Sequence, residues 1–559
     1  MAQANPAAPS SGGRGIGDTR SANGASHFGS YLAGRLASDE HDTVSAAKFL
    51  EQALAHDPDN ADLVRQTLVA MVLDGRMEEA VGLAGRLVKG DPAAAVANLV
   101  LAVEAVKRRE FAGAKARLAG LPRAGLNALL IPMIEAWVEV GLGRVDAGLE
   151  VLASLEENEA FAPFHHFHRG LINDLGGRVE PAEEAYQAAT EAQPGGAYRA
   201  VAAFGAFYER AGKPHEARRV YEAFLEENPG TLWLEDTLAR LNDGAGAERL
   251  VGDARAGVAE ALFGAASALH RENAGEAALF HVRMAVYLSP GTDVMQLLVG
   301  DILEMRHRLE AALHAYRAVD AVSPVSWSSR LRGAAAQDVL GRTEEAVAEL
   351  RAMAEERPVR TDALVALGDI LRAKERWTEA VTAYDDALAR IEKLEKRHWR
   401  LLYARGVVLE RSKQWPRAEA DFLKALELSP DLPFVLNYLG YSWVDQGVHL
   451  ERALKMIERA VEQRPDDGYI VDSLGWALYR LEDFEGAVRE LERAIELRPE
   501  DPVINDHLGD AYWRVGRRVE ARFQWQRALS LEPEEGLVAT IEEKVKHGLA
   551  AGAAPGDGI

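Results

Sequence analysis

The sequence predicts an all-α protein built as an α-solenoid, a right-handed superhelix of stacked helix–turn–helix repeats. Prolines recur at a constant interval, from Pro465 to Pro499 and on to Pro533, and a fixed period of about 34 residues is typical of helical repeats. No segment alternates apolar and polar residues as a half-buried strand would. A chain of 559 residues is also too long for a single hydrophobic core, whereas stacked repeats bury their apolar faces against their neighbours.

The clearest repeat covers residues 468–501, and each residue type in it has a packing reason. Gly475 lies in the first predicted helix and Leu491 in the second. The glycine lets the two helices approach closely, the large side chain fills the space between repeats, and Pro499, which lacks an N–H, ends the second helix. The same chemistry returns one period later at Leu508, Gly509, Ala521, Trp525, Ala528 and Pro533.

This pattern resembles the tetratricopeptide repeat (TPR), and the resemblance covers about residues 27–535. It implies a TPR α-solenoid that acts as a non-catalytic scaffold or adaptor and binds partner polypeptides in its concave groove. From the spacing of the repeats and the composition between them we predict six segments. They are a disordered leader (1–26), an N-terminal array (27–231), an irregular break (232–258), a C-terminal array (259–536), a capping helix (537–549) and a disordered tail (550–559).

Composition and charge narrow the choice of partners. The chain has 64 Lys and Arg against 87 Asp and Glu, a formal net charge of −23, which disfavours nucleic acid as a partner. It has no cysteine, so disulfides, thiol nucleophiles and thiolate metal ligands are excluded. No apolar run reaches the roughly 18 residues of a membrane span. Because residues 1–26 have no apolar signal core, we expect a cytoplasmic protein, or a periplasmic one if a signal has been removed. The oligomeric state cannot be read from the sequence.

Motifs for chemistry are missing from the sequence. It contains no phosphate-binding glycine loop, no H-E-x-x-H pair and no nucleophile elbow, so we expect neither an enzyme nor a cofactor. One cluster, His165, His166 and His168, invites a metal hypothesis, because His165 and His168 share a helix face. It lacks an acidic ligand at helical spacing, and we favour packing histidines over a metal site.

The best candidate site lies in the C-terminal repeats, on the side of each first helix that does not form the core. There, aromatic rings lie beside amide and carboxylate groups, a combination suited to contacting a peptide and bonding its backbone donors. The alternative is that these rings pack against the next repeat. The predicted groove residues are Phe434, Asn437, Tyr441, Tyr469, Asp472, Trp476, Tyr479, Asp506, Asp510 and Trp513.

The charge of this groove indicates the kind of partner. Asp472, Asp506 and Asp510 would repel a terminal carboxylate, so a basic or amide-rich segment fits better. Residues 436–533 are also similar to the end of bacterial TPR adaptors that partner a carboxyl-terminal processing protease. The alternative function is therefore a structural or regulatory TPR subunit of a bacterial envelope-biogenesis or protease complex that binds through its convex faces.

Overall fold

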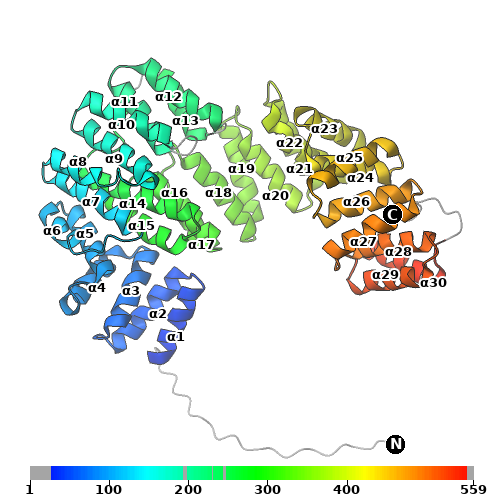
Figure 1. Cartoon of the computed structure of the whole chain (residues 1–559), viewed down its shortest axis with the longest axis horizontal. Helices are drawn as coiled ribbons and strands as arrows, with labels where there is room; N and C mark the ends of the chain where they lie inside the picture. The colour runs from blue at the N-terminus through cyan, green and yellow to red at the C-terminus, as the bar shows by residue number, and fades with distance from the viewer. Residues whose placement is uncertain (1–26, 193–197, 229–230, 243–246, 550–559) are drawn as a thin grey trace, which may run out of the picture. The chain divides into compact units, whose positions relative to one another are not determined.

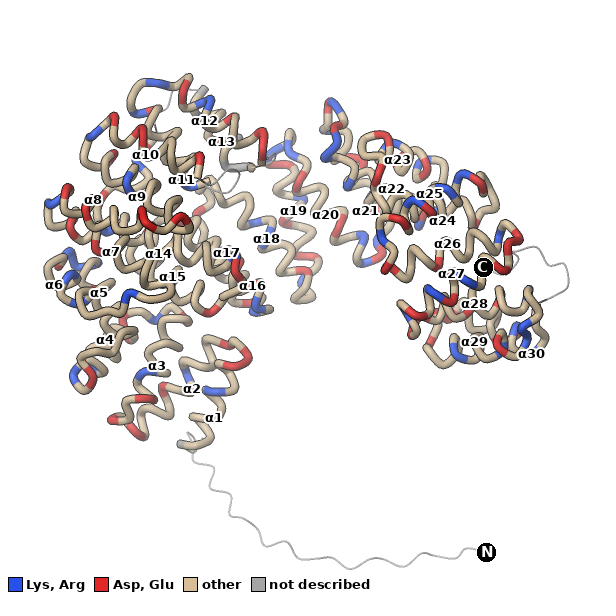
Figure 2. The backbone as a smooth tube through the Cα atoms, in the orientation of Figure 1, with Lys and Arg blue, Asp and Glu red and all other residues tan. Residues whose placement is uncertain are grey.

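The computed structural model describes residues 27–192, 198–228, 231–242 and 247–549, and every regular element within them is a helix. The predicted all-α repeat fold is therefore confirmed. Contacts divide the chain into two compact units, unit 1 (residues 1–342) and unit 2 (residues 343–559) (Figure 1). In each unit, acidic and basic residues are interspersed along the helices (Figure 2).

Unit 1 contains α1 (His27–Asp39), α2 (Thr43–His56), α3 (Ala61–Asp74), α4 (Met77–Gly90), α5 (Ala95–Lys107), α6 (Phe111–Leu118), α7 (Asn127–Gly141), α8 (Val145–Ala153), α9 (Ala162–Leu175), α10 (Val179–Ala192), α11 (Tyr198–Arg210), α12 (Pro214–Glu227), α13 (Leu232–Asn242), α14 (Ala254–Arg271), α15 (Gly275–Leu288), α16 (Asp293–Met305), α17 (Leu309–Arg317) and α18 (Ser326–Val339). Unit 2 contains α19 (Thr343–Glu356), α20 (Asp362–Ala373), α21 (Trp377–Ala389), α22 (Trp399–Arg411), α23 (Trp415–Leu428), α24 (Pro433–Asp445), α25 (Leu450–Gln463), α26 (Gly468–Arg480), α27 (Phe484–Leu497), α28 (Pro502–Arg514), α29 (Arg518–Ser530) and α30 (Glu535–His547). Two short 3₁₀ helices, Glu159–Phe161 and Lys396–His398, precede α9 and α22.

The boundaries differ from the predicted ones in the middle of the chain. The predicted break at 232–258 contains α13 and the start of α14, and the two units divide between Arg342 and Thr343. Helix α30 lies where a capping helix was expected. The predicted leader and tail lie outside the described residues.

A glycine on the first helix of a repeat faces a large side chain on the second helix of the same repeat. A Cβ added at Gly368 would overlap the ring of Tyr384, and one at Gly509 would overlap the indole of Trp525. Tyr384 and Trp525 are fully buried. The small residue therefore makes room for the ring that fills each hairpin, which is the packing reason for the period.

We expect Gly368→Ala to destabilise unit 2 by about 1–3 kcal/mol, because the added methyl group overpacks the hairpin against Tyr384. Urea unfolding followed by circular dichroism measures the loss. Gly82→Ala on α4 is the control, since a Cβ there meets no other described residue within 4 Å. It should gain up to about 1 kcal/mol from helix propensity. Equal effects of the two changes would contradict the packing argument.

In unit 1, two later helices cover inner helices of the first repeats. Helices α14 and α15 return to pack on α3, α5, α7 and α9 (Figure 1). Asp253 precedes helix α14, and its side chain caps the helix by accepting the Ala256 N–H at 2.9 Å. The helix is rich in alanine and glycine, and a Cβ at Gly257 would overlap the ring of Trp137 on α7. Small side chains thus allow α14 to lie directly against α7.

Polar contacts hold α14 and α15 in this position. Arg109 binds Asp253 at 2.9 Å, and the Tyr287 hydroxyl donates to Glu104 at 2.8 Å. The Arg283 guanidinium donates to the Leu73 carbonyl at 3.2 Å. Each contact joins residues far apart in sequence, so the inner wall of the first repeats is occupied by the chain itself.

Candidate partner-binding groove of unit 2

Three adjacent inner helices of unit 2 carry all the predicted groove residues. Helix α24 packs beside α26, and α26 packs beside α28, so their outward sides form one continuous surface. The structure divides the predicted residues on this surface into an accessible group and a buried group. The accessible group is Phe434, Asn437, Tyr441 and Tyr469, and the buried or partnered group is Asp472, Trp476, Tyr479, Asp506, Asp510 and Trp513.

The accessible group presents two exposed rings. Phe434 is 45% exposed and Tyr469 is 52% exposed. The guanidinium of Arg464 lies 4.8 Å from the centre of the Phe434 ring, and that of Arg498 lies 5.0 Å from the centre of the Tyr469 ring. The arginines hold the rings by cation–π contact and leave aromatic surface open to solvent.

A hollow of about 400 Å³ lies next to these rings, between the ends of α22, α24 and α26. Three acids, Glu410, Asp445 and Asp472, line it together with Asn437 and Tyr441. The side-chain oxygen of Asn437 is buried and accepts no hydrogen bond from any described residue. An unpaired buried acceptor is costly, and a donor from outside would remove this cost once the Asn437 side chain turns its oxygen toward the hollow.

The electrostatics of the hollow favour a cation. Burial, and then the charges of Asp472 and Asp445, raise the pKa of the Tyr441 hydroxyl well above its ordinary value. Arg411 lies 3.8 Å from Glu410 and lines the same hollow. His507 pairs with Asp472, so Asp445 is the acid of the lining that has no ion pair among the described residues. The hollow therefore offers aromatic surface, one free acceptor and negative charge.

The buried group corrects part of the prediction. The Trp476 ring stacks between Tyr479, at 4.8 Å between ring centres, and His507, at 4.1 Å. Trp476 is only 6% exposed, and its indole N–H has no acceptor among the described residues. These rings therefore pack α26 against α28, and they are closed to a partner in this structure.

The acids of α28 are also closed off. The Lys544 ammonium of α30 donates to Asp506 at 2.7 Å and to Asp510 at 2.8 Å. Asp510 also accepts the Trp525 N–H at 2.9 Å, and Trp513 donates to the Leu549 carbonyl at 3.2 Å. Because α30 and the residues after it cover this end of the wall, Asp506, Asp510 and Trp513 stabilise the array's end.

The sequence analysis did not predict a role for His507, which lies on α28 and bonds to α26. Its Nδ1 lies 2.9 Å from a carboxylate oxygen of Asp472. Burial lowers the pKa of His507, but Asp472, Asp506 and Asp510 raise it by more, so the pKa lies above its ordinary value. The imidazole is therefore charged at pH values where an exposed histidine is neutral.

We expect the stabilising effect of His507 to depend on pH. A raised pKa in the folded state means that the contribution is complete below pH 6.5, the ordinary value, and is lost as the pH rises through the raised value. The difference in unfolding free energy between wild type and His507→Asn, measured by urea titration at a series of pH values, should fall as the pH rises. A difference that grows with pH would contradict the assignment.

The histidine cluster of α9 does not converge on one point. His165 Nε2 lies 3.2 Å from Glu156, whereas His168 Nδ1 accepts the Trp137 N–H at 2.9 Å. Within the described ranges, no group of three or more His, Cys, Asp or Glu side chains is placed to hold a metal ion. His165 and His168 are both buried packing residues.

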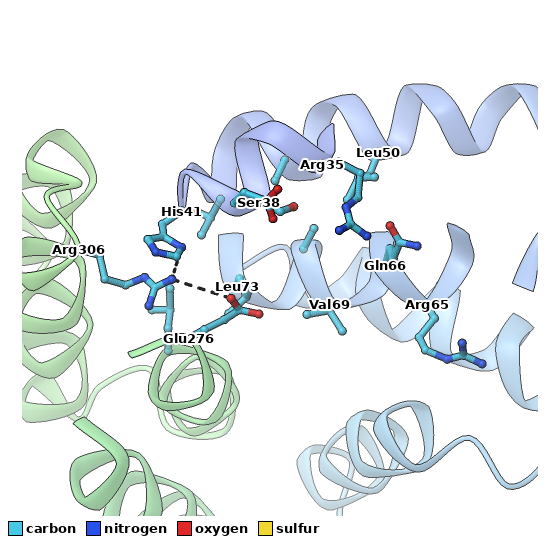
Figure 3. Close-up of a pocket in the computed structure, with 15 residues that line it drawn as sticks. Arg35, Ser38, His41, Leu50, Arg65, Gln66, Val69, Leu73, Glu276 and Arg306 are labelled. Carbon is cyan, nitrogen blue, oxygen red and sulfur yellow. Dashed lines mark hydrogen bonds and ion pairs between the residues drawn. The ribbon is translucent and has the colours of Figure 1, made fainter. Parts of the chain in front are cut away.

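A second hollow, of about 330 Å³, lies in unit 1 between α1–α3 and the α15–α16 hairpin. Figure 3 shows Arg306 reaching His41 on one side, and its guanidinium lies 3.9 Å from Glu276. Arg308 also binds Asp42 at 2.7 Å. These polar contacts connect the hairpin to the first repeat, so this hollow lies at a packing interface within unit 1.

Comparison with known proteins agrees with this repeat architecture. Tetratricopeptide repeat models match residues 37–100, 135–197 and 360–431, and a TPR repeat model matches 475–516. These segments of the chain therefore carry tetratricopeptide repeats. The matching families are repeat families, and TPR scaffolds are generally non-catalytic. Along the described helices, none is long and apolar enough to cross a bilayer.

Individual relatives are similar over limited spans or at low identity. A TPR repeat-containing protein of Pseudomonas aeruginosa is 35% identical over 80 residues, which is 14% of either chain. Among solved structures, the anaphase-promoting complex assembly Cut9–Hcn1 aligns over 94% of this chain and 97% of its own, with 14% identity and a TM-score of 0.38. MamA of Desulfovibrio magneticus aligns over 31% of this chain and 94% of its own, with 23% identity and a TM-score of 0.28.

Proposed function

We propose that this protein is a scaffold that captures a basic or amide-rich partner segment in the hollow of unit 2. Its contact surface is the accessible group Phe434, Asn437, Tyr441 and Tyr469. The observation that carries the proposal is the exposed Tyr469 ring beside the unpaired acceptor of Asn437 and three acids. Backbone or side-chain N–H groups of an extended segment would satisfy that acceptor.

The charge distribution supports a cationic partner. A lysine or arginine entering the hollow would meet Asp445, because His507 already pairs with Asp472, and would stack on Tyr441 or Tyr469. An acidic segment would meet the same carboxylates and be repelled. The predicted preference is thus for basic over acidic segments, with amide-rich ones between them.

We expect Tyr469→Ala to weaken capture of a basic peptide by about tenfold or more, because it removes the most exposed ring of the hollow. The measurement is binding to a synthetic library in which basic, amide-rich and acidic segments are equally represented. Asn437→Leu should also reduce binding of the basic peptide, and it should not allow acidic segments to bind. Both variants should keep the wild-type melting temperature, since neither the Tyr469 ring nor the Asn437 amide is part of the hydrophobic core.

A second candidate is binding through the outer helices, and one observation favours it. Val519 and Phe523 lie one turn apart on α29 and are 80% and 64% exposed, a small apolar patch on the outside of the array. Phe523→Ala is the matched control for Tyr469→Ala. If Phe523→Ala abolishes binding and Tyr469→Ala does not, the outer surface binds the partner and the groove proposal is wrong.

The partner itself is a separate proposal. The resemblance of residues 436–533 to envelope adaptors makes a carboxyl-terminal processing protease, or one of its substrates, a candidate. Pull-down with the full chain, repeated with Tyr469→Ala, would test it. A protease retained by both proteins would be bound elsewhere than in the hollow.

A further inference from the structure

An aromatic hollow of about 260 Å³ opens in unit 1 where α9, α11 and α14 meet. It is separate from the hollow of unit 2 and from the hollow between α1–α3 and the α15–α16 hairpin. Phe164 and Phe167 of α9, Tyr198 of α11 and Phe263 of α14 all contribute to its lining. Phe164, Phe167 and Tyr198 are only half-buried, so their rings present surface that the described side chains do not cover completely.

One wall of this hollow is a closed ion pair. Arg199 Nε donates to Glu260 Oε1 at 2.8 Å, and a terminal nitrogen of Arg199 donates to the other carboxylate oxygen. Glu260 is buried, and the Arg199 guanidinium lies 5.6 Å from the centre of the Phe263 ring. Because the two charges satisfy each other, this wall is polar but carries no net charge. The other charged side chain of the lining is the exposed Arg271.

Two histidines complete the lining, and both favour a neutral site. His168 is buried and accepts the Trp137 N–H at Nδ1, which places the proton of its neutral ring on Nε2. Burial lowers the pKa of His168 to about 4. His270 lines the same hollow, and its buried Nδ1 has no hydrogen-bond partner among the described residues. The hollow thus contains one imidazole position that a ligand can fill.

We infer that this hollow binds an aromatic ring carrying one N–H or O–H group, as in an indole or a phenol. The ring would lie against the aromatic side chains, and its polar group would bond to His270 Nδ1. A dry cavity of about 150 Å³ already accepts benzene, so the observed volume suits a substituted or fused ring. The same chemistry occurs in free small molecules and in Trp or Tyr side chains of a partner.

The test is titration of the full chain with indole and 1-methylindole by isothermal calorimetry. Indole should bind at one site with a Kd on the order of 1 mM or tighter. 1-Methylindole, which lacks the N–H, should bind several-fold more weakly. In His270→Leu, indole and 1-methylindole should bind equally.

A blocked variant locates the binding. A Cβ added at Gly264 of α14 lies 3.4 Å from the Phe164 ring, so Gly264→Leu projects into the hollow and should weaken indole binding at least tenfold. Gly82→Leu is the matched control on an open helix face and should bind as wild type. If Gly264→Leu does not fold, indole binding is measured with Ser267→Leu, which changes another lining position.

The outcome that overturns the proposal is an absence of saturable indole binding. Indole binding that survives in folded Gly264→Leu and Ser267→Leu also overturns it, because the ring would then bind elsewhere. N-acetyltryptophanamide distinguishes the two sources of the ligand. Binding as tight as that of indole indicates a partner side chain, whereas binding at least tenfold weaker indicates a free small molecule.

Discussion

Lys544→Ala is expected to destabilise unit 2 by about 3–5 kcal/mol at pH 8, the cost of leaving buried charges without their partner. The Lys544 ammonium binds both Asp506 and Asp510, and all three side chains are shielded from water. Burial lowers the pKa of Lys544, but the two carboxylates raise it by more, to about 12. The lysine is therefore charged at every pH of interest. Urea unfolding followed by tryptophan fluorescence measures the loss.

The loss should shrink at pH 5. Burial and the neighbouring Asp506 raise the pKa of Asp510 to about 6 even with Lys544 present, and without the lysine the pKa rises further. Asp510 is then protonated at pH 5, and its repulsion with Asp506 disappears. Lys546→Ala is the control on the same helix, where the side chain is 56% exposed, and should cost no more than about 0.5 kcal/mol. Equal losses from both lysines would refute the buried-triad interpretation.

Gly257→Leu is expected to destabilise unit 1 by about 3 kcal/mol or more, because there is no room for a side chain between α14 and α7. An added Cβ already overlaps Trp137, which is fully buried and fixed by its hydrogen bond to His168. The ring cannot move aside without breaking that bond. Hydrogen exchange should show α14 and the facing helix losing protection together.

Gly264→Ala provides the matched control within the same helix. Its Cβ meets the half-buried Phe164 ring at an ordinary contact distance of 3.4 Å, so α14 should stay in place and gain up to about 1 kcal/mol from helix propensity. If Gly257→Leu unfolds at the wild-type urea concentration with unchanged exchange in α14, the close packing of α14 on α7 does not stabilise unit 1.

The repeat fold could be predicted because its signal is local. Gly368 and Tyr384, or Gly509 and Trp525, belong to one hairpin and keep the same spacing in sequence, so a single period reveals them. The position of α14 has no such signal. Gly257 faces Trp137, which belongs to a helix much earlier in the chain, and from sequence alone the glycine indicated an irregular break.

The groove was predicted in part for a related reason. Helical periodicity placed the residues on one side of α24, α26 and α28, but it cannot tell which of them a later element covers. Lys544 reaches Asp510 from α30, and His507 covers Trp476 from the next inner helix. One signal was available. Asp510 bonds to Trp525 with the same sequence separation as Asp369 and Tyr384, so this aspartate belongs to the packing pattern.

The return of α14 onto earlier helices also constrains how the protein is made. A nascent chain leaves the ribosome from its N-terminus at about 5–20 residues per second. Helix α7 ends at Gly141 and α14 at Arg271, so Trp137 waits on the order of ten seconds for the helix that covers it. During that interval the apolar surface of α7 that α14 later covers is exposed on the nascent chain. Chaperone capture during translation should therefore be concentrated between the emergence of α7 and that of α14.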